Sequence, residues 1–220
     1  MKVNNLCRHS ISLCLLILFS TLARAQSTLL IDEDFALFQS TSRKDVSKQL
    51  DQYTRQPGWS GLRVYIEKGK SGQVTVGGSS SGTDGFIVTP PFTATTGAIT
   101  VCVEVASVSA RAWDGITVAL AEPDGLQYIL KPDTRLYMES ADITTNFDSY
   151  YITLYYDAPC RVRIDPNKNA YIRCIKVWDG TYTATSISGV QSSPNRPSRP
   201  PYPVTGNIVI MDGKKYIKSK

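Results

Sequence analysis

Hydrophobic and polar residues alternate with a period of two along much of the chain after residue 70. The clearest case is AITVCVEV (98–105), in which Ile99, Val101, Val103 and Val105 occupy every second position. Similar short runs are GQVTV (72–76), WDGITVAL (113–120), residues 127–130 and YYITLYY (150–156). Alternation of this kind is typical of strands that bury one face, as in two sheets packed together. The pattern therefore predicts an all-β protein, an antiparallel β-sandwich.

Turn signals separate these runs at short intervals. Pro-Asp-Gly occupies 123–125 and Asp-Gly 84–85, and both are frequent in tight turns between strands. The last two runs, 161–164 and 171–177, flank the sequence DPNKN, so we predict that they pair as a hairpin. Only residues 42–53 carry a weak helical pattern.

The first 25 residues have the layout of a secretory signal peptide. Lys2 and Arg8 precede the apolar run ISLCLLILF (11–19), and Ala23-Arg24-Ala25 forms a small-x-small cleavage site. The apolar run is too short for the roughly 20 residues that a membrane-spanning helix needs, and no later segment approaches that length. We predict export to the cell surface or medium, with no transmembrane segment after cleavage.

Composition divides the remaining chain into three parts. Residues 26–182 are rich in β-branched and aromatic residues and form the predicted β-sandwich domain. Residues 183–203 are dominated by Ser, Gly and Pro, which indicates an extended linker. Residues 204–220 form a short basic C-terminal segment, a possible sorting or anchoring tip.

Histidine and charge exclude several function classes. The single histidine, His9, lies in the signal peptide, so the mature chain has no histidine base, His-assisted nucleophile or His-ligated zinc. Residues 26–190 carry 15 basic and 18 acidic side chains, a net charge of −3. The domain therefore lacks the excess of cations that nucleic-acid binding requires.

Three cysteines remain after processing: Cys102, Cys160 and Cys174. An odd number in an exported chain permits at most one internal disulfide. Cys160 and Cys174 flank the predicted hairpin turn, and their placement permits a disulfide; the alternative is that both stay reduced. Cys102 lies in an apolar strand and is interpreted as a small buried hydrophobic residue.

Several short motifs follow one another in a characteristic order along the chain. Asp32-Glu33-Asp34-Phe35 is followed by Gly58-Trp59, by FIVTPP (86–91) and by a closing strand at 172–178. This order resembles the jelly-roll modules of Bacteroidetes surface proteins of the cleaved-adhesin and choice-of-anchor J type. The resemblance implies a jelly-roll fold and an adhesin-like role. The chain departs from it at Arg173-Cys174, where those modules have an acidic pair.

The resemblance also implies a structural calcium ion, because such jelly rolls often hold one. Asp32, Asp34 and Asp179 are the candidate ligands, if the first and last strands lie close together. The alternative is that these acids flank strands and stay in water.

Aromatic residues near loops are candidates for ligand contact, because their rings combine an apolar face with a polar edge. Trp113, beside Arg111, is the first choice, followed by Tyr128 and Tyr137. Trp59 and Trp178 are expected to be buried.

The function that fits these features is a non-catalytic binding module, adhesin-like, which recognises a glycan or an extracellular or host protein. One alternative is a structural subunit of a surface assembly. The other is a glycosidase built on two carboxylates, for which Glu104 and Glu139 are weak candidates. We assign no catalytic residue.

Overall fold

A computed structural model describes residues 27–78, 85–108, 115–139, 143–167 and 169–181, together with the backbone of 207–211 and 214–218. These residues form strands and one short 3₁₀ helix, η1 (Leu50–Gln52). The helical pattern at 42–53 therefore yields a single turn. The signal peptide and the linker predicted at 183–203 lie outside the described residues. Within them, no helix has the length and apolar character needed to cross a bilayer.

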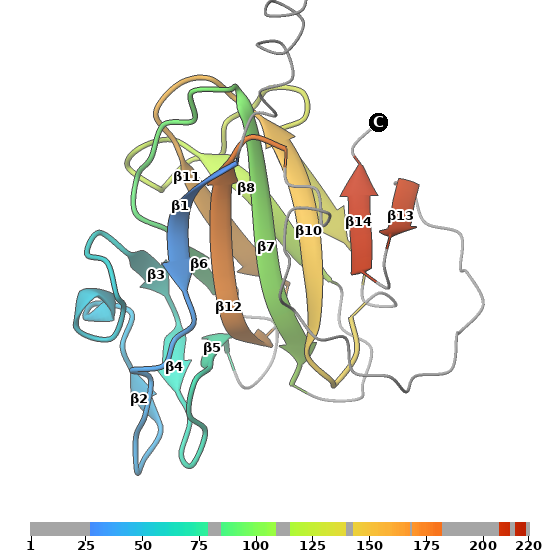
Figure 1. Cartoon of the computed structure of the whole chain (residues 1–220). Coiled ribbons are helices and arrows are strands. Elements are labelled where there is room, and N and C mark those ends of the chain that lie inside the picture. Colours follow the sequence, from blue (N-terminus) through green and yellow to red (C-terminus); the bar gives the residue numbers. More distant parts are fainter. Residues whose placement is uncertain are drawn as a thin grey trace, which may run out of the picture.

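The strands form two sheets that pack face to face, with the larger sheet in front in Figure 1. The larger sheet contains β1 (Thr28–Glu33), β2 (Lys44–Asp45), β4 (Val64–Ile66), β5 (Val74–Gly77), β7 (Ala98–Ser107), β10 (Asp148–Tyr155), β12 (Asn169–Asp179), β13 (Asn207–Met211) and β14 (Lys214–Lys218). The smaller sheet contains β3 (Ser60–Leu62), β6 (Phe86–Val88), β8 (Ile116–Ala121), β9 (Arg135–Met138) and β11 (Arg161–Pro166).

The strand order is that of a jelly roll. Four neighbouring strands of the larger sheet are ordered β5-β12-β7-β10, and four of the smaller sheet are ordered β6-β11-β8-β9. Within these eight strands, the chain passes from one sheet to the other after β5, β6, β7, β9, β10 and β11. Two interlocked Greek keys of this kind define the jelly roll. The predicted fold class, an antiparallel β-sandwich, is confirmed by the chain's own topology.

The alternation seen in the sequence builds the core. Ile99, Val101, Val103 and Val105 of β7 are fully buried, as are Ile116, Val118 and Leu120 of β8 in the opposite sheet. Burial of each such side chain contributes about 1.5–3 kcal/mol relative to its exposure. The core therefore forms between the two sheets, from alternate residues of the strands that face each other.

The predicted hairpin between 161–164 and 171–177 is wrong. β11 pairs with β6 and β8, whereas β12 pairs with β1, β5 and β7 in the other sheet. The short link after β11 crosses between sheets instead of turning back within one.

The same separation accounts for the cysteines. Cys160 lies opposite Phe92, and Cys174 lies opposite Glu104 in the larger sheet. Cys102, Cys160 and Cys174 are all free thiols, so the predicted Cys160–Cys174 disulfide is not formed. Cys102 is buried, as predicted.

Candidate functional site

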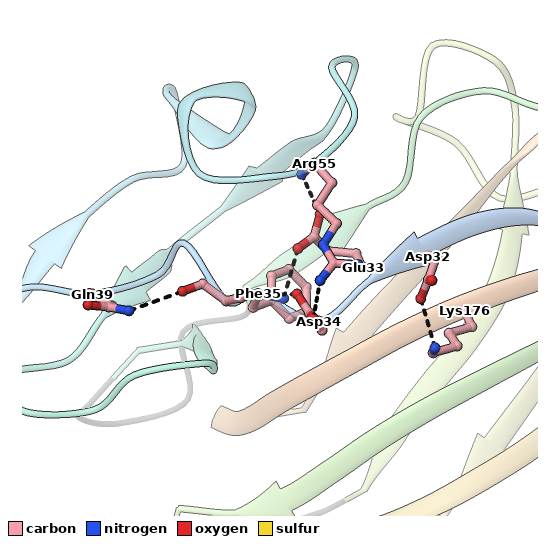
Figure 2. A network of polar contacts seen from close by, with 8 residues as sticks. Asp32, Glu33, Asp34, Phe35, Gln39, Arg55 and Lys176 are labelled. Atoms are coloured by element: carbon pink, nitrogen blue, oxygen red, sulfur yellow. Dashed lines mark hydrogen bonds and ion pairs between the residues drawn. The ribbon is translucent and has the colours of Figure 1, made fainter. Parts of the chain in front are cut away.

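The acidic stretch at the start of the domain forms a structural corner (Figure 2). Glu33 is almost fully buried, and its two carboxylate oxygens accept hydrogen bonds from the backbone N–H groups of Phe35 and Arg55, each at 2.7 Å. Burial raises the pKa of Glu33, although the two backbone hydrogen bonds act in the opposite direction. Glu33 thus ties the end of β1 to the loop that follows η1.

The aromatic residues of the same motifs pack beneath this corner. The Phe35 ring makes edge contacts with Phe38 and Trp59, at ring-centroid distances of 5.1 and 5.9 Å. Trp59 is buried, as predicted. Phe35 has a φ of +53°, which is uncommon for a bulky residue. The Glu33 carboxylate accepts a hydrogen bond from the backbone N–H of Phe35. Phe35 and Trp59, two residues of the motifs that carry the family resemblance, are therefore parts of the core.

The structure does not bring the three candidate calcium ligands together. Asp32 forms an ion pair with Lys176 at 2.8 Å, and Asp34 forms one with Arg55 (Figure 2). The Lys176 pKa is raised, because its partner Asp32 outweighs the lowering effect of burial. Because β1 runs antiparallel to β12, Asp179 lies opposite Thr28, at the other end of β1.

Asp179 instead holds a turn before β7. Its carboxylate accepts hydrogen bonds from the backbone N–H and the hydroxyl of both Thr95 and Thr96, at 2.6 to 3.0 Å. Burial by itself would raise the pKa of Asp179, but these four hydrogen bonds outweigh it and lower the pKa to about 2. No group of three or more metal-ligating side chains occurs among the residues with described side chains. Asp32, Asp34 and Asp179 therefore do not form one calcium site, because each is engaged in a different contact.

The outer face of the smaller sheet carries a cluster of aromatic and charged side chains around Arg163. The Arg163 guanidinium lies over the Phe86 ring at 3.9 Å from its centroid and over the Tyr128 ring at 4.8 Å. It forms an ion pair with Asp165 at 3.1 Å and donates to the Leu126 carbonyl oxygen at 2.7 Å. Cation–π contacts of this kind are worth about 0.5–2 kcal/mol each. The cation is thus held between two rings and is neutralised by a carboxylate.

Tyr128 reaches this cluster from a loop. The run at 127–130, predicted as a strand, makes a single β-bridge from Tyr128 to Ala121. The Tyr128 hydroxyl donates to the Asp165 carboxylate. Burial, followed by this hydrogen bond and the negative charge of Asp165, raises the Tyr128 pKa. The loop after β8 therefore covers Arg163 and leaves Leu126 and Leu130 exposed.

Tyr137 extends the surface across the sheet. Tyr137 on β9 lies opposite Thr117 on β8, and Thr117 lies opposite Asp165 on β11. On the other side of β11 in the sheet, Phe86 on β6 lies opposite Leu62 on β3. Tyr137 and Leu62 are 49% and 46% exposed. Five strands at about 4.8 Å spacing make this row roughly 19 Å long. We call this surface the Arg163 patch: Leu62, Phe86, Tyr128, Tyr137, Arg163 and Asp165.

The other two predicted ligand contacts, Arg111 and Trp113, lie outside the described residues. The chain is described again from Gly115, where an added Cβ atom would lie 2.8 Å from the Tyr137 hydroxyl oxygen. Sequence reasoning named Tyr128 and Tyr137 as contact candidates without placing them together, and it did not name Phe86 or Arg163 as contact residues. The alternation of Arg161, Arg163 and Asp165 with apolar residues was the available signal.

A second aromatic pair lies on the outer face of the larger sheet. Trp178 stacks on Tyr151 with a centroid distance of 6.4 Å and an interplanar angle of 28°. Trp178 is half-buried, so the expectation that it is a core residue is wrong. The bulge in β12 between Ile172 and Cys174 lets Ile172 and Ile175 both reach the core.

The candidate carboxylate pair for hydrolysis is not assembled. Glu104 lies on β7 and faces Arg173 at 3.6 Å, whereas Glu139 follows β9 in the other sheet and is exposed. The two acids belong to different sheets, so they do not flank a common bond as a glycosidase requires.

Comparisons with known proteins find similarity in structure only. No protein-family model matches the chain, and no curated protein sequence does. The K3 cleaved adhesin domain of Lys-gingipain from Porphyromonas gingivalis is 11% identical with a TM-score of 0.41, over 68% of this chain and 98% of that one.

Two sugar-binding modules are similar at the same level. The C-terminal CBM6 of a laminarinase from Zobellia galactanivorans is 16% identical with a TM-score of 0.36, over 53% of this chain and 89% of that one. The lumenal domain of VIP36, with Ca²⁺ and Man3GlcNAc bound, is 8% identical with a TM-score of 0.39, over 62% and 89%. The fold assignment rests on the strand order of the chain itself.

Proposed function

We propose that this chain is an exported, non-catalytic binding module and that the Arg163 patch contacts an extended glycan. The observation that carries the proposal is the guanidinium held between the rings of Phe86 and Tyr128 and fixed by Asp165. Such an arrangement keeps aromatic surface in place before a ligand arrives, which lowers the entropy cost of binding.

The charge of the patch favours a sugar over a polyanion. Asp165 neutralises Arg163 at 3.1 Å, so the guanidinium is not available as a phosphate clamp. The exposed ring of Tyr137, the half-buried ring of Phe86 and the exposed Leu62 offer apolar surface next to polar edges. Sugar rings present apolar faces bordered by hydroxyl groups, and aromatic side chains with a polar edge suit such faces. Calcium is no part of the proposal, because Asp32, Asp34 and Asp179 are engaged in other contacts.

The test is a glycan array probed with the mature chain, followed by calorimetry on the best ligand with two matched variants. Tyr137→Ala removes an exposed tyrosine from the patch. Tyr155→Ala removes one of similar exposure, 46%, from β10 in the other sheet. We expect Tyr137→Ala to weaken binding about tenfold or more, in line with loss of an aromatic anchor, and Tyr155→Ala to leave it unchanged.

Three results contradict the proposal. The first is equal loss of binding in the two variants, and the second is an array with no signal above background. The third is a ligand whose binding depends on single Asp or Glu residues and is accompanied by turnover, which would indicate the glycosidase alternative. Binding of a protein instead of a glycan, with the same dependence on Tyr137, would keep the patch and change the ligand class.

A further inference from the structure

The C-terminal hairpin occupies one edge of the larger sheet. β10 pairs with β7 on one side and with β14 on the other, and β13 pairs with β14 (Figure 1). Residues 150–153 of β10 lie opposite 215–218 of β14. Among the described strands, β14 alone covers this edge of β10.

The jelly roll is complete without this hairpin. Its two four-stranded Greek keys, β5-β12-β7-β10 and β6-β11-β8-β9, are formed by strands that precede the hairpin in the chain. Without β14, the edge of β10 would present unpaired N–H and C=O groups, which readily accept another strand. The hairpin therefore covers an edge that the folded body leaves open.

The pairing of β10 with β14 joins two strands that are far apart in the sequence. β14 runs parallel to β10, and a parallel pair cannot be closed by a tight turn. β11, β12 and the 25 residues 182–206 separate the two strands in the chain. Main-chain hydrogen bonds are the same whichever molecule supplies the strand, so β10 accepts a hairpin from its own chain or from another copy.

Linker length sets the competition between these two sources. Twenty-five residues can reach at most about 80–90 Å, and a tether of that length holds the hairpin at an effective concentration of about a millimolar. A chain's own hairpin wins in dilute solution. Hairpins of neighbouring molecules compete once the molecules are crowded to a similar local concentration, as on a surface.

We propose that the β10 edge is the site at which copies of this chain exchange C-terminal hairpins, with residues 207–218 of one copy paired to β10 of the next. The exchange needs no new contact type, since it reuses the ladder already formed within one molecule. It is independent of the Arg163 patch, which belongs to the other sheet.

The test uses full mature chains that each carry one engineered cysteine. Thr153 and Lys218 are opposite each other in the register of β10 and β14. A tagged Thr153→Cys chain is mixed with an untagged Lys218→Cys chain at about 1 μM and about 1 mM, which bracket the effective concentration, and treated with a short thiol cross-linker. A covalent heterodimer in excess of random cross-linking indicates exchange.

The controls give each outcome a meaning. The pair Thr153→Cys and Lys48→Cys reports random cross-linking, because Lys48 is exposed and lies beyond β2, at the opposite side of the larger sheet. Adding Ile217→Pro removes an N–H from β14 and prevents pairing. A single chain with both Thr153→Cys and Lys218→Cys reports pairing within one molecule.

We expect at least about tenfold more heterodimer than in the Lys48 control near 1 mM, little at 1 μM, and loss of the product with Ile217→Pro. Heterodimer no greater than the Lys48 control at 1 mM overturns the proposal, whether the doubly substituted chain cross-links internally or not. An internal cross-link would then show pairing without exchange, and none would show that β14 does not occupy β10.

Discussion

Replacing Asp179 by Asn tests whether a carboxylate at the end of β12 holds the turn before β7. Asp179 is 6% exposed, and each of its two oxygens accepts two of the four hydrogen bonds from Thr95 and Thr96. An asparagine keeps one oxygen acceptor and turns an NH₂ group toward two donors. A threonine hydroxyl can accept from this NH₂ group but a backbone N–H cannot, so the variant loses at least one hydrogen bond and the charge that strengthens all four.

The magnitude follows from the pKa of Asp179. The pKa of the Asp179 carboxyl group falls from 3.8 to about 2 in the folded protein. Each pKa unit corresponds to about 1.36 kcal/mol of free energy. Because the folded-state pKa is the lower one, the ionised carboxylate stabilises the fold above the unfolded-state value, and this stability is lost as the pH falls. The contribution is about 2 kcal/mol at pH 7, about 1 kcal/mol at pH 3 and well below about 1 kcal/mol at pH 2.

Urea unfolding of the mature chain at pH 7 and pH 3 measures this difference. We expect Asp179→Asn to lower the free energy of unfolding by about 2 kcal/mol at pH 7 and by about half as much at pH 3. Asp157→Asn, an exposed acid in the loop before β11, serves as the matched control and should change little. An Asp179→Asn effect that is equal at both pH values, or below about 0.5 kcal/mol at pH 7, would refute the reasoning.

Four further predictions follow from other contacts. Glu33→Gln leaves one of two buried backbone N–H donors without an acceptor, so unfolding experiments should show a loss of about 1–3 kcal/mol; a neutral effect would contradict this role. Gly115→Ala places a methyl group 2.0 Å from the Met138 carbonyl oxygen at a φ of +107°, and we expect a loss of at least about 2 kcal/mol in the same assay. Arg163→Lys keeps the charge but loses the planar stacking and the bidentate geometry; near-ultraviolet circular dichroism of the tyrosines should change, and an unaltered spectrum would indicate that the stack is absent. Thiol titration of the mature chain should detect three cysteines in denaturant and at most one, slowly, in the native protein, since two are buried and the half-buried Cys174 has a pKa raised by burial to about 12; fewer than three in denaturant would reveal a disulfide.

Local alternation predicted the strands but not their partners. The sequence predicted β7 because apolar residues at every second position indicate a strand with one buried face, and eight residues are enough to show this pattern. The strands that pair with β11 depend on how the whole sheet is arranged, which no local pattern shows. Turn residues after a strand fit a hairpin and a crossover between sheets equally well, so DPNKN gave no means to separate them. The disulfide prediction for Cys160 and Cys174 failed with the hairpin on which it depended.

The calcium prediction failed for a related reason. Asp32, Asp34 and Asp179 flank strands that are indeed neighbours, as β1 pairs with β12. Antiparallel pairing sets the end of one strand against the start of the other, which places Asp179 beside Thr28 and away from Asp32. Adjacency of strands was inferred correctly, and the direction of pairing decided which side chains met.

The charged residues of β11 form a site only together with the loop after β8, which is distant from them in sequence. Arg161, Arg163 and Asp165 alternate with buried residues, which from sequence alone indicates a solvated outer face. In the structure Arg161 is buried, donating to the carbonyl oxygens of Gly58 and Thr89, and the loop after β8 lies over Arg163. Asp165, two residues along the same face, forms the ion pair that neutralises the covered Arg163 guanidinium. The side chains that satisfy Arg163 are therefore the same ones that hold the aromatic surface in place, so stability and recognition at this patch should fail together when Arg163 is replaced.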